Sequence, residues 1–137
     1  MRQKIAIFGA GAIGRGFIAP LFLSKDYEID FIDSNEKLVK ELNLKKKYIL
    51  GVTSEEKYIF KTITFNKAYC NKENINIKKH DIVFSCVGPD QCFANVDYYK
   101  RAKILISCEN DIETVPKLKK LTSNKNIYFG IPDVITS

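Results

Sequence analysis

Residues 4–16 read KIAIFGAGAIGRG, an apolar stretch that runs directly into a series of spaced glycines. The apolar stretch predicts a short buried strand, because it is bounded by a turn signal. The spacing of Gly9, Gly11 and Gly14 is typical of the turn that binds the phosphates of a dinucleotide. Beyond the turn the apolar residues switch to helical spacing: Ile13, Phe17, Ile18, Leu21 and Phe22. The sequence therefore predicts a strand, a phosphate-binding turn and a helix, although a glycine turn without a ligand has the same pattern.

Each glycine of this turn has a separate physical task. Gly9 permits the tight turn, Gly11 lets the backbone approach the pyrophosphate, and Gly14 lets the helix pack closely on the strand. The helix N-terminus directs its N–H groups and positive dipole end toward the phosphates. We therefore expect the following residues to bind the cofactor: Gly9, Ala10, Gly11, Ala12, Ile13 and Gly14.

A second predicted strand covers residues 27–32 and is followed by Asp33. Asp33 lies 24 positions after Gly9 (33 − 9 = 24), close to the roughly 20 expected for the acid that binds the adenosine ribose hydroxyls. Its charge would repel a 2′-phosphate, so the sequence favours NAD over NADP as cofactor. Ser34 is expected in the same site and can also cap the next helix.

Length and composition indicate one globular domain. The 137 residues are 45% apolar and 28% charged, as in ordinary soluble proteins. No apolar run approaches the roughly 20 residues that span a bilayer, and no secretion signal is recognisable. The net charge of +6 comes mainly from scattered lysines, whereas nucleic-acid-binding proteins cluster Arg and Lys on one face. We expect a cytoplasmic protein with neither a membrane nor a nucleic-acid partner.

The four cysteines show no spacing typical of a metal site. Cys70, Cys86, Cys92 and Cys108 form no CxxC and no pairing with histidine. Cys86 and Cys108 fall inside predicted central strands, where a thiol acts as a small hydrophobe. The sequence predicts no metal site and fits a reducing compartment.

The order of elements predicts an α/β fold with a doubly wound, mainly parallel sheet of the Rossmann type. Near-continuous apolar runs at 81–87, 103–108 and 126–131 alternate with predicted helices at 90–102 and around Leu118 and Leu121, which is typical of a parallel sheet covered on both faces. Residues 48–64 predict a β-hairpin insertion, and the polar stretch 66–80 a loop with a short edge element. Residues 1–137 are interpreted as one dinucleotide-binding domain.

Ligands of such sheets bind at the carboxyl ends of the strands. That edge should carry Val87, Gly88 and Pro89, which we expect to border the cofactor, and further along Glu109, Asn110 and Asp133. Asn110 can donate a hydrogen bond to a substrate oxygen but cannot act as a base. Glu109 could in principle act as the base, but it is interpreted as a helix-start or ion-pairing residue, the more common role just past a buried strand. His80 falls at the opposite edge and is interpreted as a solvated loop residue. The domain should therefore hold a cofactor without completing a hydride transfer alone.

Three segments resemble the long-chain mannitol (polyol) dehydrogenase family, which includes mannitol-1-phosphate 5-dehydrogenases. They are FGAGAIGRGFI at residues 8–18, Val-Gly-Pro at 87–89 and Ser-Cys-Glu-Asn at 107–110. The insertion at 48–64 also has a counterpart in that family. The resemblance covers the amino-terminal domain of the family and essentially the whole of this chain.

The resemblance implies an NAD(H)-dependent oxidoreductase acting on a polyol or polyol phosphate, with mannitol 1-phosphate favoured. It assigns the glycines to the pyrophosphate, Asp33 to the ribose and Asn110 to the substrate oxygen. The family's catalytic lysine belongs to a helical carboxyl-terminal domain, which these residues do not contain. Residues 132–137, PDVITS, align with the family's Val-Asp-Arg-Ile segment but lack its arginine. Arginine is a natural partner for a phosphate group, so this difference leaves an unphosphorylated polyol open as the substrate.

Two other functions fit the same residues at this point. One is a non-enzymatic, nucleotide-sensing Rossmann module, which would need no catalytic base. The other is the NAD-binding domain of a sugar-acid or hydroxyacid dehydrogenase, since the fold is shared by many enzymes.

Overall fold

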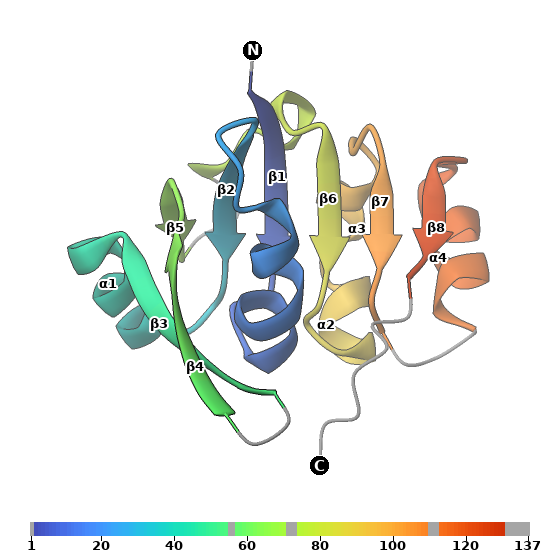
Figure 1. Ribbon diagram of the computed structural model, residues 1–137. Coiled ribbons are helices and arrows are strands. Elements are labelled where there is room, and N and C mark those ends of the chain that lie inside the picture. The colour runs from blue at the N-terminus through green and yellow to red at the C-terminus, as the bar shows by residue number, and fades with distance from the viewer. Residues whose placement is uncertain (1, 55–56, 71–73, 110–112, 131–137) are drawn as a thin grey trace.

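Six parallel strands form the central sheet of the computed structural model, which describes residues 2–54, 57–70, 74–109 and 113–130 (Figure 1). The strands are β1 (Gln3–Phe8), β2 (Tyr27–Ile32), β5 (Lys67–Tyr69), β6 (Ile82–Ser85), β7 (Leu105–Ser107) and β8 (Ile127–Phe129). Their order is β5-β2-β1-β6-β7-β8, and all five neighbouring pairs are parallel. The chain progresses outward from β1 to β5 and then returns to β6, so the topology reverses between β1 and β6. This confirms the predicted Rossmann-type fold.

Helices cover both faces of the sheet. One layer contains η1 (Gly14–Ile18), η2 (Ala19–Phe22) and α1 (Glu36–Lys45). The other contains η4 (Ile77–Lys79), α2 (Pro89–Phe93), α3 (Val96–Tyr99) and α4 (Thr114–Thr122). β1 shows why two layers are needed, because Ile5 and Ile7 pack into one apolar cluster, and Ala6 and Phe8 into the other. Its continuous apolar run is buried on both sides.

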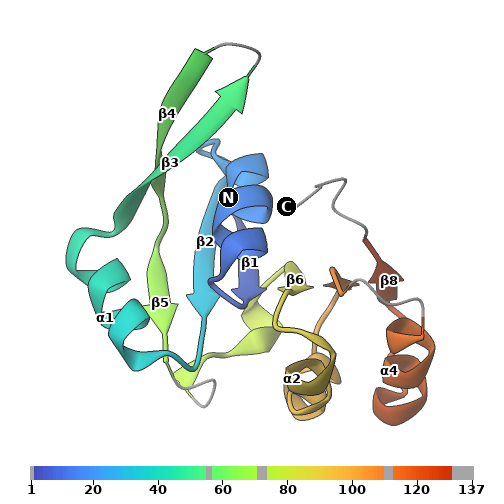
Figure 2. The same cartoon turned by 90° about the horizontal axis from the view of Figure 1, so that it is seen from below.

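The predicted insertion is an antiparallel hairpin that extends away from the sheet (Figure 2). β3 (Lys47–Ser54) and β4 (Lys57–Thr64) pair from Lys47↔Thr64 to Ser54↔Lys57. Its base is fixed by a buried Ile63 and by Phe65, whose ring lies edge-on to Phe31 with centroids 5.3 Å apart. The base is therefore part of the core, whereas Ile49 and Phe60 further out are strongly exposed.

The helix after the glycine turn is not the regular α-helix that its spacing predicts. η1 is a π-helical turn in which the Ala19 amide bonds back to the Gly14 carbonyl, and η2 is a 3₁₀ turn. Pro20 contributes to this change, because it has no N–H to donate to the carbonyl four residues earlier. Pro20 therefore accounts in part for the change from π-helical to 3₁₀ winding.

Two other helices also differ from prediction. The single helix expected at 90–102 is divided into α2 and α3, and at the break the Asn95 side chain donates to the Gln91 carbonyl at 2.9 Å. Such side-chain bonds compete with the helical ladder. The cap of α1 is Asn35, which accepts from the Leu38 amide at 3.1 Å, and not Ser34. Across the residues described, no helix is long and apolar enough to cross a membrane.

Candidate functional site

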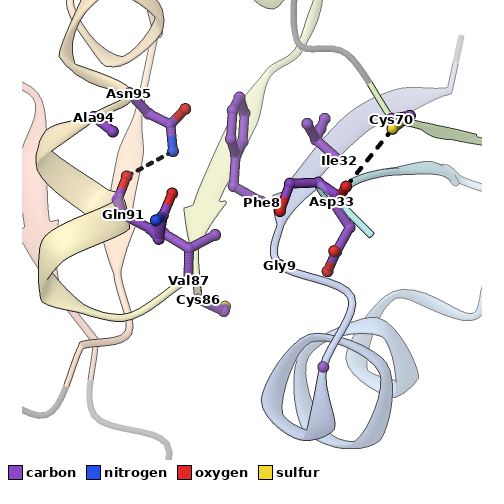
Figure 3. A pocket seen from close by; sticks show the side chains of 12 residues that line it. Phe8, Gly9, Ile32, Asp33, Cys70, Cys86, Val87, Gln91, Ala94 and Asn95 are labelled. Atoms are coloured by element: carbon purple, nitrogen blue, oxygen red, sulfur yellow. Dashed lines mark hydrogen bonds between the residues drawn. The ribbon is translucent and has the colours of Figure 1, made fainter. Parts of the chain in front are cut away.

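A pocket of about 470 Å³ opens at the carboxyl ends of β1, β2 and β6. It lies at the place where the strand order reverses, which is where open α/β sheets bind their ligands. Figure 3 shows Asp33 on one side of the pocket and Cys86 and Val87 on the other, with Gly9 between them. The lining residues are Phe8, Gly9, Gly11, Ile32, Asp33, Ser34, Cys70, Cys86, Val87, Gln91, Ala94 and Asn95.

Two glycines of the turn are required by its backbone. Gly9 has a φ of +100°, a conformation that side chains disfavour, and an added Cβ there would meet the Cys86 carbonyl. At Gly14 an added Cβ would meet the Gly9 carbonyl and the Ile7 side chain. These two glycines therefore allow the strand, the turn and the helix to pack closely.

Gly11 has a different environment, because an added Cβ would meet no atom within 4 Å. The packing of the fold therefore does not require a glycine here, and the close approach of a phosphate to the backbone at Gly11 stays a prediction. The Arg15 amide bonds to the Gly11 carbonyl at 3.0 Å, so the first helical turn begins at Gly11. The amides that precede Arg15 are those that a helix N-terminus leaves for capping groups or anions.

The hairpin contacts this helix through the half-buried side chain of Tyr48. Tyr48 at the start of β3 donates a hydrogen bond from its hydroxyl to the Arg15 carbonyl at 2.6 Å. Burial raises the pKa of Tyr48 above its usual range, so the hydroxyl keeps its proton and remains a donor. The hairpin therefore supports the outer side of the candidate phosphate-binding helix.

The Asp33 carboxylate is held by two backbone amides. Its Oδ2 accepts from the Ala10 amide at 2.8 Å, and its Oδ1 accepts from the Asn35 amide at 2.9 Å. The side chain also lines the pocket. Each carboxylate oxygen has a second acceptor position, so Asp33 can still accept hydrogen bonds from the hydroxyls of a ribose.

The turn at residues 87–89 is held by Glu109. Its Oε1 accepts from the Val87 amide at 3.1 Å and from the Ser85 hydroxyl at 3.3 Å. Tyr99 in turn donates from its hydroxyl to the Ser85 hydroxyl oxygen at 2.7 Å. Burial raises the pKa of Glu109, and hydrogen bonds from Val87, Ser85 and Gly88 partly oppose that rise. The interpretation of Glu109 as a helix-start or ion-pairing residue was wrong, because α4 begins at Thr114 and the Glu109 carboxylate braces the turn.

The structure places the other predicted residues in and around this pocket. Gly9, Gly11, Asp33, Ser34 and Val87 line it. The other predicted residues are neighbours of the lining residues in the chain. Ala10 donates to Asp33, Ala12 and Ile13 precede η1, Gly14 begins η1, Gly88 caps α2 with a φ of +92°, and Pro89 is the first residue of α2. Asn110 and Asp133 lie outside the described residues.

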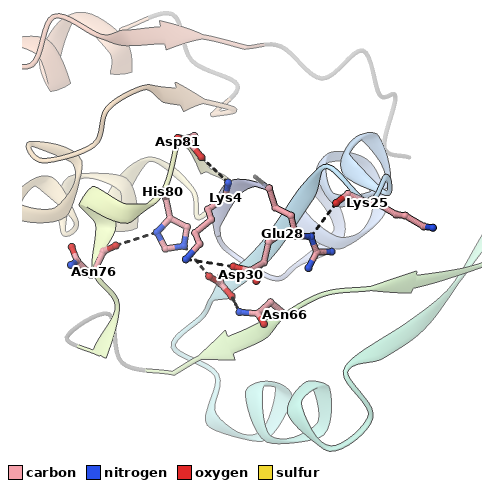
Figure 4. Close-up of polar contacts among 9 residues, drawn as sticks. Lys4, Lys25, Glu28, Asp30, Asn66, Asn76, His80 and Asp81 are labelled. Carbon is pink, nitrogen blue, oxygen red and sulfur yellow. Dashed lines mark hydrogen bonds and ion pairs between the residues drawn. The ribbon is translucent and has the colours of Figure 1, made fainter.

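His80 is at the predicted edge of the sheet but in an environment opposite to the predicted one. It is only 4% exposed, and its Nε2 lies 2.9 Å from Oδ2 of Asp30 (Figure 4). Asp30 also accepts from the Asn66 side chain at 2.9 Å, and His80 Nδ1 lies 3.2 Å from the Asn76 carbonyl oxygen. The solvated-loop interpretation was therefore wrong, because the short η4 turn folds over the sheet and buries the histidine.

Several lining residues were missed from the sequence. Cys70 follows β5 directly, so the carboxyl-end rule could have identified it. Gln91 and Asn95 lie on or just after α2, and their position depends on how that short helix turns, which no sequence pattern shows. Within the described residues, no group of three or more His, Cys, Asp or Glu is placed to hold a metal ion.

Comparison with known proteins identifies the family. Residues 3–126 match the mannitol dehydrogenase Rossmann domain. This chain belongs to the mannitol dehydrogenase family. A mannitol-1-phosphate 5-dehydrogenase of Shouchella clausii is 37% identical over 132 residues, and one of Buchnera aphidicola is 34% identical over 142 residues. These alignments cover 86% and 93% of this chain but 35% of each relative, so the chain spans about a third of their length.

Solved structures share the fold of this mannitol dehydrogenase family domain at low sequence identity. An NADP+-bound yersinopine dehydrogenase superposes with a TM-score of 0.74 at 12% identity, covering 93% of this chain and 34% of that one. The probable 2-dehydropantoate 2-reductase panE of Bacillus subtilis superposes with a TM-score of 0.66 at 17% identity, covering 98% and 44%. A Rossmann domain in a dehydrogenase family indicates a nicotinamide nucleotide as cofactor.

Proposed function

We propose that this chain is the NAD-binding domain of a cytoplasmic oxidoreductase that interconverts a polyol or polyol phosphate and the corresponding ketose, with mannitol 1-phosphate as the favoured substrate. The family and the names of the two relatives support the reaction. The cytoplasmic location is supported by the four cysteines, all of which are free thiols. The family match also favours an enzyme over a nucleotide-sensing module.

The observation that carries the proposal is the pairing of Gly11 with Asp33 at one pocket. Gly11 offers backbone with open space around it, which fits a pyrophosphate. Asp33 offers a carboxylate held in place by the Ala10 amide, which fits the two hydroxyls of an adenosine ribose. A 2′-phosphate would bring negative charge to that carboxylate, which favours NAD over NADP.

The remaining residues would position the other half of the cofactor. The nicotinamide ring, when bound, supplies the acceptor or donor of the hydride. Val87 lines the pocket across from Asp33, and Glu109 holds the Val87 amide, so this turn presents a fixed wall. We propose that Asn110, which follows Glu109, donates a hydrogen bond to the substrate oxygen.

The acid–base group is proposed to come from outside this chain. Hydride transfer from an alcohol requires a group that accepts the hydroxyl proton. The carboxylate of Glu109 is committed to the Val87 amide and the Ser85 hydroxyl. The resemblance to the family implies that a lysine performs this step, and we propose that it belongs to a further domain, in the two thirds of the relatives' length that the alignments leave uncovered.

Turnover by the full-length protein tests the proposed reaction. NAD reduction would be followed with mannitol 1-phosphate, mannitol, other polyols and a panel of hydroxy acids. The proposal predicts NAD-dependent oxidation of a polyol or its phosphate, fastest with mannitol 1-phosphate. Turnover of hydroxy acids alone would contradict the polyol reaction. Turnover that requires NADP would contradict the cofactor assignment.

A further inference from the structure

Cys86 and Cys108 occupy matching positions on neighbouring strands. Ser85 of β6 pairs with Ser107 of β7 in parallel register, and the Cys108 amide donates to the Ser85 carbonyl at 2.9 Å. Cys86 and Cys108, which follow these two serines, therefore lie side by side just past the ends of β6 and β7. Adjacent strands lie about 4.8 Å apart, inside the roughly 4.4–6.8 Å between Cα atoms that a disulfide requires.

The two thiols also share one face of the sheet. Successive residues of a strand point to opposite faces, and Ser85 points to the face on which it meets Tyr99 and Cys92. Cys86 and Cys108 both pack against the other apolar cluster. The two thiols therefore lie on the same face of neighbouring strands, and a hydrogen bond between them shifts the pKa of each.

This pair is accessible, unlike a thiol in the core. Cys86 lines the pocket at the carboxyl edge, and both residues are half-buried. Cys92, on the other face, is fully buried. Cys70 lines the same pocket, but its thiol contacts the Ser34 carbonyl at 3.8 Å. Cys108 is not among the lining residues, but like Cys86 it is partly exposed at this edge of the sheet, so a small oxidant can reach either thiol of the pair as well as the separate thiol of Cys70.

The hydrogen bond makes the two thiols unequal. It lowers the pKa of Cys108, because the bond from Cys86 stabilises a thiolate there. The same bond, together with burial, raises the pKa of Cys86. Since the thiolate is the nucleophile in thiol chemistry, Cys108 is suited to react first and Cys86 to react second.

We propose that Cys86 and Cys108 form a reactive dithiol that a peroxide oxidises to an intramolecular disulfide at the edge of the pocket. The Cys108 thiolate attacks one peroxide oxygen, the O–O bond breaks, and the departing oxygen takes up a proton to leave as water or an alcohol. Cys108 is then a sulfenic acid. The Cys86 sulfur attacks the Cys108 sulfur, the S–S bond forms as the S–O bond breaks, and the hydroxyl leaves as water with the Cys86 proton. The two sulfurs lose two electrons and the peroxide gains them.

Thiol counting and peptide mapping after hydrogen peroxide treatment test this inference, which does not depend on the proposed function because no nucleotide is needed. We expect two of the four thiols to be lost together and to return with dithiothreitol. Trypsin would then release residues 80–100 joined to 104–117, with fragmentation placing the bond at Cys86. A bond between Cys86 and Cys70, or peroxide modification of Cys70 while both members of the pair stay reduced, would overturn the proposal.

Two variants assign the order of the steps. In Cys86→Ser no disulfide forms, and Cys108 is trapped as a sulfenic acid by dimedone. In Cys108→Ser the remaining Cys86 stays a thiol at the same peroxide dose. Cys70→Ser is the matched control, because it removes a pocket thiol and leaves the disulfide intact. Dimedone labelling of Cys86 in Cys108→Ser at the rate seen for Cys108 in Cys86→Ser would contradict the assignment. Circular dichroism checks that each variant is folded. The wild-type peptide map tests the disulfide itself even if a variant fails to fold.

Discussion

The carboxylate of Asp33 accepts a hydrogen bond from the amide of Ala10 at 2.8 Å, which joins the end of β2 to the glycine turn after β1. The two parts of the sequence that predicted a dinucleotide site are therefore connected directly by the fold. Because the second carboxylate oxygen accepts from Asn35, the acid has one fixed orientation toward the pocket. A preorganised acceptor loses less freedom when a ligand binds.

Replacing Asp33 by Asn tests this connection. Asparagine has one side-chain oxygen, so either Ala10 or Asn35 would lose its acceptor. We expect NADH affinity to fall by roughly tenfold or more, which corresponds to about 1.4 kcal/mol, and the preference over NADPH to narrow. Calorimetric titration with both nucleotides measures the effect. Asp26→Asn is the control, because it removes the same charge from an exposed residue before β2. Equal losses in the two variants would mean that overall charge, and not Asp33, determines binding.

Alanine substitutions at Gly11 and Gly14 should separate binding from folding. At Gly14 the new methyl group meets the Gly9 carbonyl and Ile7, and we expect unfolding free energy to fall by about 1–3 kcal/mol. At Gly11 the methyl group meets no protein atom within 4 Å, so stability should be unchanged while NADH affinity falls. Urea unfolding and NADH titration measure the two effects. A Gly11→Ala variant that binds NADH as tightly as wild type would show that the phosphates do not approach this residue.

His80 should matter for stability and not for the pocket. His80→Ala leaves Asp30, which is 4% exposed, with one partner fewer, and buried groups that lose a partner cost about 1–3 kcal/mol. The thermal midpoint should fall while the NADH dissociation constant stays unchanged, because His80 and Asp30 meet away from the carboxyl edge (Figure 4). The exposed neighbour provides the control, as Lys79→Ala should leave both values unaltered. Weaker NADH binding in the folded His80→Ala variant would contradict this separation.

Glu109 should make stability depend on pH. Its pKa is raised in the folded chain, so the folded state retains this proton at pH values where the unfolded chain has released it. Stability should therefore decrease as pH rises from the ordinary carboxyl pKa to the raised one, and remain level above it. Urea unfolding across that range, with Glu109→Gln beside wild type, measures this contribution. The variant should show a flatter dependence, and identical slopes for the two proteins would exclude Glu109 as its source.

The sequence predicted the parts of the site whose chemistry is local. The glycine turn, Asp33 and Val87 each come shortly after a strand. The carboxyl ends of parallel strands meet at one edge of the sheet, regardless of the conformation of the loops. The hairpin at 48–64 was likewise predicted from two adjacent β-rich stretches. These features needed no knowledge of distant contacts.

The parts that the sequence did not predict depend on distant contacts. Glu109 accepts from Val87, which is 22 residues away, and His80 meets Asp30, 50 residues away. A buried polar residue looks like a surface residue in the sequence until its partner is known. The matched positions of Cys86 and Cys108 are of the same kind, because only the strand register places them side by side.

Direct titration of this chain with NADH and NADPH by calorimetry is the measurement that tests the central claim, namely that the pocket between Gly11 and Asp33 binds NAD(H). One nucleotide should bind per chain, NADH should bind more tightly than NADPH, and Gly11→Ala should weaken binding without loss of stability. Absence of NADH binding to the folded chain, or tighter binding of NADPH, would contradict it.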